Sequence, residues 1–371
     1  MQFFSSDCKS LKNTAGNAGR TYMRAIQLTD YGSVDNMKAV DVPEPKPGKG
    51  EVLVKIAFAG LRFGDIMARH GDPVRHFEPP FEWIPGQEVT GYIEAVGEGV
   101  TKWSVGDRVF GKPRGGAYAE YVNVPEDRVD PVPDNVRLDV FLAYPINLRT
   151  AWFLVYPWGQ VQPGQSVLVH SAAGGVGRLA VQIMKRKLWD VNVIALCGSD
   201  EKVEICKTDG ADHVINYKTH DYVEEVEKIV GAKPRGFAPG VDGGGVHVSF
   251  NGVRGPTLKT DPMVIKKRGR WILYGHSGDK IVGIDNTHGS RELIDTQPYT
   301  YDGITIMPYS NLAWLGQPEQ ALAETFVRDW LQREELMEPT VYPLEEVPLA
   351  QRLMEEGKTT GKIVFKIGGE Q

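Results

Sequence analysis

Short apolar runs, separated by glycine and proline, follow one another from residue 23 to about residue 144. Examples are residues 51–57, 89–96 and 119–124, and turn sequences such as Pro45-Lys-Pro-Gly48 lie between them. Runs of this length that end at Gly or Pro are typical of β-strands joined by tight turns. The pattern predicts a small, mostly antiparallel β domain with a barrel-like or sandwich shape.

After residue 144 the pattern changes to alternating strands and helices. Apolar strands are predicted at residues 166–170 and 191–196, and residues 176–187 between them carry apolar side chains at helical spacing. These segments form one βαβ unit of about thirty residues. Further strands are predicted at residues 213–216, 246–251, 270–274 and 303–307. Six strands in this arrangement indicate a doubly wound, parallel α/β sheet.

Two amphipathic helices, at residues 318–334 and 344–356, and a final strand at 362–367 are predicted at the end of the chain. At its start, residues 1–22 are rich in Ser, Asn, Gly and Lys and show no apolar periodicity. We expect a disordered tail there. A mitochondrial targeting segment is the alternative, because the tail has only one acidic residue, although its basic residues are few.

The composition is that of an ordinary globular chain. It has 371 residues, 41% of them hydrophobic and 24% charged, and a formal net charge of -6. This length allows two domains of normal size. The sequence has neither a basic stripe nor interleaved basic and aromatic repeats, which argues against a nucleic-acid partner.

Cysteine is sparse, with only Cys8, Cys197 and Cys206. The chain therefore has no disulfide framework and no Cys-x-x-Cys pair for a structural zinc site. This favours a reducing compartment, and we expect a cytoplasmic protein. The longest apolar runs are far shorter than the roughly 20 residues of a membrane-spanning helix, so only peripheral contact with a membrane stays open.

A glycine-rich turn stands between the first predicted strand and helix of the α/β region. It reads Ser171-Ala-Ala-Gly-Gly-Val-Gly177 and matches the dinucleotide fingerprint as A-x-G-x-x-G. Glycine lets the backbone approach a phosphate closely, and the free N–H groups of the helix start attract negative charge. We therefore predict a dinucleotide site; the alternative is a tight strand-helix turn without a ligand.

The end of the second predicted strand bears on the choice of cofactor. An NAD site usually has Asp or Glu there to bind the ribose 2′-hydroxyl, whereas this chain has Cys197 and Gly198. Ser199, Lys202 and Tyr217 could instead surround a 2′-phosphate. This predicts NADPH, unless Lys202 is an ordinary solvated helix residue and Tyr217 only packs.

The residues resemble a known family, the zinc-less quinone oxidoreductase branch of the medium-chain dehydrogenase/reductase superfamily and, more narrowly, the vesicle amine transport protein homologues. The motifs that carry the resemblance are residues 59–71, 85–91, 106–109, 162–177 and 360–364. The resemblance extends from Met23 to Ile367. It implies a GroES-like substrate and catalytic domain at residues 23–145, a Rossmann NADPH-binding domain at 146–315, and a C-terminal segment, 316–371, that returns to the catalytic domain.

The resemblance also bears on metal binding. Zinc-dependent relatives have Cys at the position of Arg62 and His at that of Gln87, and neither Arg nor Gln is a plausible ligand of a catalytic zinc ion. No metal is therefore expected. The implied reaction is transfer of a hydride from NADPH to a quinone or an α,β-unsaturated carbonyl compound.

Arg62, Asp65 and Asn147 are the candidate catalytic residues. Quinone reductases usually have Asn at the position of Arg62, in the active-site cleft. An Arg there would stabilise a developing oxyanion or bind a carboxylate; the alternative is an ion pair with Asp65 that braces the loop. No general acid is evident, because Tyr92 and Tyr118 are both expected in strands, so water is the expected proton source.

Other site residues follow from position alone. Asn147 and Thr150 match positions near the nicotinamide, and His276 follows the fifth strand of the α/β region. Residues 251–255 depart from the Asp-x-x-Gly-Gly turn that is common in relatives. The cofactor-binding residues that we expect are Thr150, Ala173, Gly174, Gly175, Val176, Gly177, Ser199, Lys202, Tyr217, Asn251, Tyr274, His276 and Lys362.

Two further functions are weighed against the quinone or enone reductase. One is an NADPH-binding, vesicle- or membrane-associated transport-type protein with low turnover, because a fold does not determine a function. The other is an enoyl thioester reductase of secondary metabolism, which a wide, basic cleft around Arg62, Arg75 and His76 would favour. The resemblance also implies a homodimer, because relatives of this architecture pair the last strand of the nucleotide-binding sheet, here at residues 303–307, across a two-fold axis.

Overall fold

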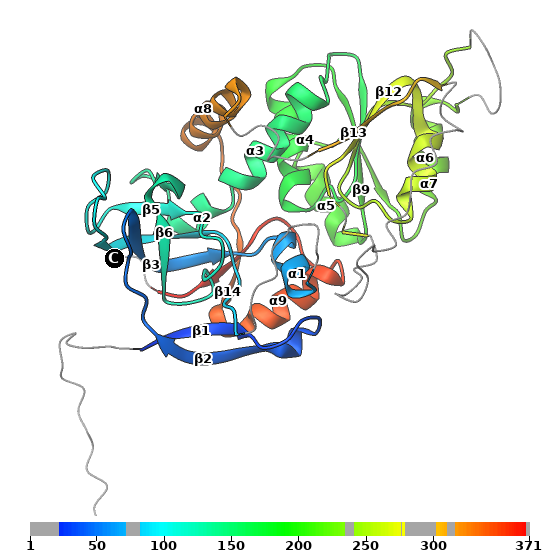
Figure 1. Ribbon diagram of the computed structural model, residues 1–371. Helices are drawn as coiled ribbons and strands as arrows, with labels where there is room; N and C mark the ends of the chain where they lie inside the picture. Colours follow the sequence, from blue (N-terminus) through cyan, green and yellow to red (C-terminus); the bar gives the residue numbers. More distant parts are fainter. Residues whose placement is uncertain are drawn as a thin grey trace, which may run out of the picture.

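The computed structural model describes residues 22–71, 82–233, 241–275, 277–278, 302–309 and 316–368. It contains one mostly antiparallel β region and one region in which a parallel sheet is covered by helices (Figure 1). The predicted fold class is confirmed. Residues 1–21 of the predicted tail lie outside the described residues.

The β region begins with an antiparallel pair, β1 (Tyr22–Leu28) and β2 (Met37–Pro43). A second, seven-stranded sheet has the order β14-β15-β3-β4-β5-β7, and β6 also pairs with β3. Its strands are β3 (Glu51–Gly60), β4 (Val89–Val96), β5 (Arg108–Gly111), β6 (Tyr121–Pro125), β7 (Val129–Pro131), β14 (Thr340–Pro343) and β15 (Ile363–Lys366).

The end of the chain completes this sheet. β15 pairs antiparallel with β3 through Val364 and Gly60, and parallel with β14. Two short helices lie at the sheet, α1 (Phe63–Arg69) and α2 (Leu138–Leu142). The C-terminal helix α9 (Val347–Glu355) lies beside α1 (Figure 1).

The parallel sheet has the strand order β10-β9-β8-β11-β12-β13. The strands are β8 (Ser166–Val169), β9 (Asn192–Cys197), β10 (His213–Asn216), β11 (Val246–Asn251), β12 (Ile265–Leu273) and β13 (Thr305–Pro308). This order reverses between β8 and β11, which is the doubly wound topology. All six predicted strands are therefore present, although β12 begins five residues earlier than expected, with a bulge between Ile265 and Arg270.

Helices cover both faces of the parallel sheet (Figure 1). They are α4 (Gly175–Lys187), α5 (Asp200–Thr208), α6 (Tyr222–Val230) and α7 (Thr257–Val264). Helix α3 (Pro145–Phe153) packs on α4, and α8 (Pro318–Arg333) packs on α3. Short 3-10 turns lie at Val34–Asn36, Glu126–Arg128 and Leu344–Glu346, and a π-helical turn, Leu154–Trp158, follows α3. None of the helices in the described part of the chain is both long and apolar enough to cross a membrane.

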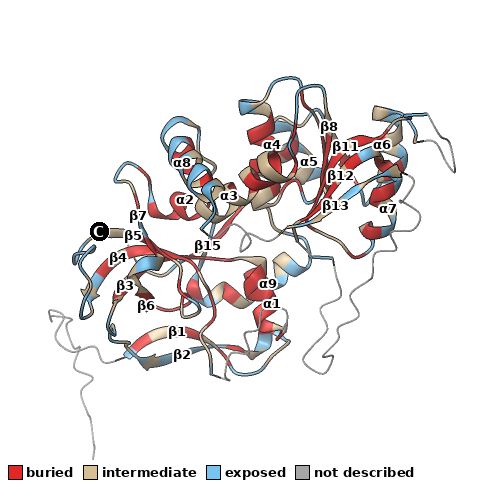
Figure 2. Cartoon of the chain, turned by 45° about the horizontal axis from the view of Figure 1, so that its top comes forward, coloured by how far each residue is buried: buried red, intermediate tan, exposed pale blue. Residues whose placement is uncertain are grey.

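Alternating side chains of the central strands fill two cores. Val167 and Val169 pack into one core with α4, whereas Leu168 packs into the other. Successive side chains of a strand point to opposite faces, so a strand buried on both faces is apolar throughout. The buried residues of this region lie mainly on these strands and on the helix faces that are turned to the sheet (Figure 2).

Candidate functional site

The glycine-rich turn connects β8 to the start of α4. Ser171 adopts a φ of 48°, and Gly174 precedes the helix without any side-chain cap. A Cβ atom on Gly177 would lie 2.4 Å from the Ser171 carbonyl oxygen, and one on Gly175 would lie 2.6 Å from Asn147 Nδ2. The backbone N–H groups at this helix start have no side-chain cap, and the glycines leave space beside them. Such a helix start can bind a phosphate group.

The C-terminal return borders this turn. Gly361 N donates to the Ala173 carbonyl oxygen at 2.8 Å. The next residue, Lys362, is buried and donates from Nζ to the Leu61 carbonyl oxygen at 3.0 Å and to the Glu88 carboxylate. The Lys362 ammonium group is thus directed to the β region, where a buried carboxylate neutralises it.

The residues expected around a 2′-phosphate lie together at the end of β9. Ser199 caps α5 by accepting from Lys202 N at 3.4 Å. A Cβ atom on Gly198 would lie 2.6 Å from the Tyr217 hydroxyl oxygen and 3.5 Å from Lys218 Cε. Lys218 therefore adds a second cation that the sequence analysis missed; its position directly after Tyr217 was the available signal.

Charges at the end of β9 influence one another. Burial lowers the pKa of Lys202, and Lys218 acts in the same direction, whereas the neighbouring Cys197 thiol opposes them. A hydrogen bond with the Cys206 thiol lowers the pKa of Cys197 to about 7. This corner of the site therefore combines two ammonium groups with a readily ionised thiol.

Arg62 and Gln87, which stand where zinc-dependent relatives have ligands, bind each other. Arg62 Nη2 donates to Gln87 Oε1. No group of three or more His, Cys, Asp or Glu residues that could hold a metal ion occurs in the described part of the chain. The guanidinium group is only partly buried, so its position is set by Gln87 while part of it stays accessible.

Asp65 contacts Arg62 through the backbone rather than through an ion pair. Its Oδ2 accepts from Arg62 N at 2.9 Å and from the Tyr118 hydroxyl at 3.0 Å. Asp65 is completely buried, and burial raises its pKa although the Arg62 charge opposes this. Among the described residues, no ion pair joins the two side chains, so the predicted bracing of the loop comes from the capping of α1.

Tyr118 is not in a strand, contrary to the expectation. It lies in the segment before β6, because β6 begins only at Tyr121. Its side chain is fully buried, and burial together with Asp65 raises its pKa well above the ordinary value. Tyr92 lies in β4 as expected.

Two expected nicotinamide-side residues lie on α3, and a third lies at the end of β12. Asn147 Nδ2 donates to the Ala143 carbonyl oxygen at 3.1 Å, and Thr150 Oγ1 donates to that of Ile146 at 2.8 Å. Tyr274 packs against Gly252, where a Cβ atom would lie 2.7 Å from its Cζ. His276, Arg75 and His76 lie outside the described residues.

Asn251 shapes the turn that departs from the relatives. Its Oδ1 accepts from Val253 N at 2.9 Å and from Arg254 N at 2.8 Å. Its Nδ2 donates to Thr257 Oγ1 at 2.7 Å and to Asp261 Oδ2 at 2.8 Å. The amide thus joins the turn after β11 to helix α7.

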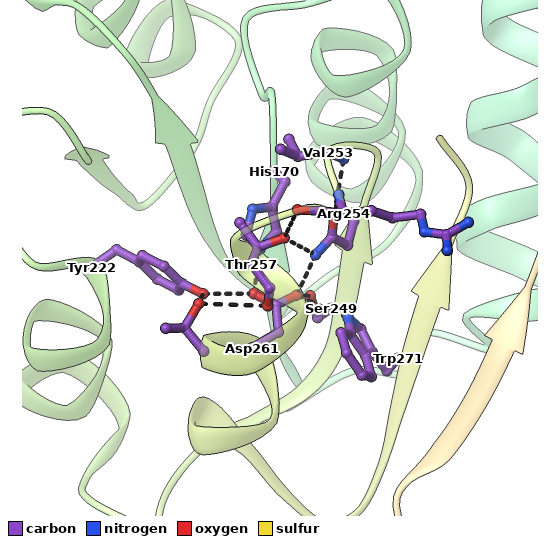
Figure 3. Close-up of polar contacts among 10 residues, drawn as sticks. His170, Tyr222, Ser249, Val253, Arg254, Thr257, Asp261 and Trp271 are labelled. Atoms are coloured by element: carbon purple, nitrogen blue, oxygen red, sulfur yellow. Dashed lines mark hydrogen bonds and ion pairs between the residues drawn. The ribbon is translucent and has the colours of Figure 1, made fainter. Parts of the chain in front are cut away.

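Asp261 is the centre of a buried network that sequence reasoning did not find (Figure 3). Its Oδ2 accepts from Ser249 Oγ at 2.8 Å and from Trp271 Nε1 at 2.9 Å, besides Asn251. Its Oδ1 accepts from the Tyr222 hydroxyl at 2.9 Å and lies 2.7 Å from His170 Nε2. One carboxylate therefore connects the residue before the glycine-rich turn with the end of β11.

Comparison with protein families finds two matches along this chain. The model described as "Alcohol dehydrogenase GroES-like domain" matches residues 48–134, and that described as "Zinc-binding dehydrogenase" matches residues 175–310. Among curated proteins, the synaptic vesicle membrane protein VAT-1 homolog of Danio rerio is 35% identical over 358 residues. The alignment covers 92% of this chain and 69% of the relative.

Solved structures give a consistent picture. A mycobacterial protein, Rv1454c, solved in complex with NADPH, has a TM-score of 0.79 and 29% identity, over 93% of this chain and 100% of that chain. A quinone oxidoreductase of Pseudomonas syringae has a TM-score of 0.77 and 26% identity, with the same coverage of 93% and 100%. Both similarities span the β region and the parallel sheet together.

Proposed function

Because the chain belongs to the zinc-less quinone oxidoreductase branch of the medium-chain dehydrogenase/reductase superfamily, we propose that it is an NADPH-dependent reductase of quinones or α,β-unsaturated carbonyl compounds. The observation that carries this proposal is the uncapped start of α4 at Gly175, bordered by Asn147 and followed along the sheet by Lys202 and Lys218. This arrangement suits a dinucleotide with an additional phosphate group.

The residues present fit this cofactor, which supplies the hydride when it is bound. The N–H groups at the start of α4 would hold the pyrophosphate. Lys202, Lys218 and the Tyr217 hydroxyl would hold the 2′-phosphate, since charge-assisted hydrogen bonds are roughly twice as strong as neutral ones. Asn147 lies against Gly175, so its side chain would hold α3 next to the bound cofactor.

Arg62 is the proposed electrostatic catalyst. Reduction of a conjugated carbonyl group places negative charge on its oxygen, and a donor that is already oriented stabilises this charge. Gln87 orients the guanidinium group through the bond to Nη2. Asp65 is too deeply buried to reach a substrate, so we assign it a positioning role, in which it holds the backbone of Arg62.

Solvent water is the proposed proton source. The Tyr118 hydroxyl donates a hydrogen bond to Asp65 and is fully buried, and its raised pKa opposes ionisation. Neither Tyr118 nor Lys362, which is bound by Glu88, is positioned to exchange protons with a substrate. A water molecule would deliver the proton after hydride transfer.

Steady-state NADPH oxidation with a panel of quinones, enones and enoyl thioesters tests the proposal, with and without a metal chelator. We expect turnover with quinones or enones that the chelator does not reduce. Turnover confined to enoyl thioesters would support the enoyl reductase instead. Tight NADPH binding without turnover of any acceptor would support the transport-type protein.

A further inference from the structure

A basic pocket lies at the edge of the parallel sheet opposite the glycine-rich turn. The turn follows the carboxyl end of β8, whereas this pocket is formed at the amino ends of β8, β11 and β12. Its volume is about 200 Å³. The lining residues are Gln165, His247, Lys266, Lys267, Arg268, Gly269 and Arg270.

Two cations of this pocket, Lys266 and Arg270, are poorly neutralised by the described residues. Arg268 pairs with the exposed Asp242 at 3.0 Å, whereas the acceptors that Arg270 has among the described residues are neutral, the carbonyl oxygen of Gln160 and Oε1 of Gln165. Lys266 Nζ lies 3.5 Å from His247 Nε2. Within the described residues, neither Lys266 nor Arg270 has a carboxylate partner, and no lining residue is acidic.

The backbone of β12 is bent in a way that gathers these cations. The register with β11 shifts between Val246 and Val248, and the bulge that results brings Lys266, Lys267 and Arg268 to one pocket. A regular strand would send successive side chains to opposite faces. Arg268 adopts a φ of 61°, a backbone conformation that is strained for a residue other than glycine and is concentrated at functional sites.

Arg270 provides an independent indication of a ligand. Its Nε is buried and has no hydrogen-bond partner, although both Nη groups are bonded. Buried polar groups without a partner are rare in folded proteins. In addition, burial and then the charges of Lys266 and Arg270 lower the pKa of His247, which shows that the pocket disfavours further positive charge.

We propose that this pocket binds a small, multivalent phosphate anion of the diphosphate class, at a site separate from the cofactor. Such an anion would neutralise Lys266 and Arg270 at once, and both ammonium and guanidinium groups bind phosphate oxygens well. The pocket has a volume of about 200 Å³, whereas one water molecule occupies roughly 30 Å³. The pocket is therefore large enough to hold such an anion.

Calorimetric titration of the full chain with inorganic pyrophosphate tests this inference. Saturating NADPH occupies the glycine-rich turn during the titration. We expect pyrophosphate to bind, and the double variant Lys266→Gln/Lys267→Gln to weaken its Kd by about tenfold or more. Lys38→Gln/Lys102→Gln, which removes two exposed cations of the β region, is the matched control and should leave the Kd unchanged.

Sedimentation with vesicles identifies the source of the phosphate. If phosphatidylcholine vesicles containing phosphatidylinositol phosphate bind the native protein but not the double variant, the ligand is a lipid headgroup. Binding of pyrophosphate without vesicle binding indicates a free anion. The inference is overturned if the native protein binds neither, if NADPH displaces the pyrophosphate, or if the correctly folded double variant and the single variant Lys266→Gln bind as tightly as the native protein.

Discussion

Lys202 Nζ donates a hydrogen bond to the carbonyl oxygen of Gly357 at 2.6 Å and so ties helix α5 to the turn after α9. The acceptor is neutral, so this hydrogen bond does not cancel the positive charge that the lysine carries at the end of β9. An anionic group arriving at Gly198 would therefore find this charge already held nearby. The contact connects the choice of cofactor with the position of the C-terminal segment.

Lys202→Ala should weaken NADPH binding and leave NADH binding almost unchanged, because only NADPH carries the 2′-phosphate. A hydrogen bond between charged groups contributes about 1.5 to 3 kcal/mol, which corresponds to roughly ten- to a hundredfold in affinity. Calorimetry with both cofactors measures this. Lys207→Ala, on the same helix but paired with Glu204, is the control. Equal losses for the two cofactors would show that Lys202 is only a solvated helix residue.

Arg62→Ala should lower kcat by roughly a hundredfold, the loss expected when one donor to a developing oxyanion is removed. NADPH affinity should not change, because Arg62 lies on the β region beside Gln87. Arg62→Lys keeps the charge and should recover part of the rate. If Arg62 instead only stabilises the loop, both variants will have a lower Tm but a native kcat.

Gly177→Ala should destabilise the fold by about 1 to 3 kcal/mol, since the added Cβ atom meets backbone and the turn must shift. The contact with the Ser171 carbonyl oxygen would be 2.4 Å, compared with 3.2 Å for Gly174→Ala. Gly174→Ala is thus the milder partner variant. Urea unfolding of both proteins gives the two free energies, and a larger loss for Gly174→Ala would contradict the geometry of the turn.

Asp261→Asn should reduce the free energy of unfolding at pH 7 by about 3 to 5 kcal/mol, because several buried donors lose hydrogen bonds to a charged group, each of which contributes about 1.5 to 3 kcal/mol. Burial acts to raise the pKa of Asp261, but His170 and the other donors outweigh it and hold the pKa below its ordinary value. The carboxylate therefore stabilises the fold above its unfolded pKa of about 3.9 and loses this effect as the pH falls through the folded pKa.

Urea unfolding of the native protein and Asp261→Asn from pH 7 to pH 4 measures this dependence. The difference between the two proteins should be constant at the upper end of the range and should narrow only near pH 4. A difference that vanishes already between pH 7 and pH 6 would indicate that another group controls the network.

The protein should be a homodimer in solution. Among the described residues, β13 is the last strand of the parallel sheet and pairs only with β12, which leaves its other edge without a partner strand from this part of the chain. Pairing of this edge across a two-fold axis would satisfy its backbone groups. Light scattering at micromolar concentration gives the mass, and a value for a single chain would contradict the prediction.

The sequence pattern predicts most of the parallel sheet, because apolar strands buried on both faces and an amphipathic helix at residues 176–187 have strong periodicity. The β region is less regular. The run predicted as a strand, residues 119–124, begins two residues before β6, and Tyr118, which is also expected in a strand, lies before both.

The network around Asp261 could not be predicted in this way. Its members come from separate strands and helices, and only the folded chain brings His170 and Tyr222 to the same carboxylate. Periodicity reports which face of an element is buried and contains no information on which polar groups meet across elements. The same limit explains why Lys218 and the bulge before Arg270 were missed.

The place of β15 in its sheet has a consequence for synthesis of the protein. Ile363–Lys366 lies between β14 and β3, and its Val364 and Phe365 pair with Gly60 and Ala59. A ribosome makes these residues after all strands of the parallel sheet, long after β3 has emerged. The nascent β region therefore keeps an open strand edge at β3 while the parallel sheet is being translated, and in this interval the edge is exposed to wrong pairing.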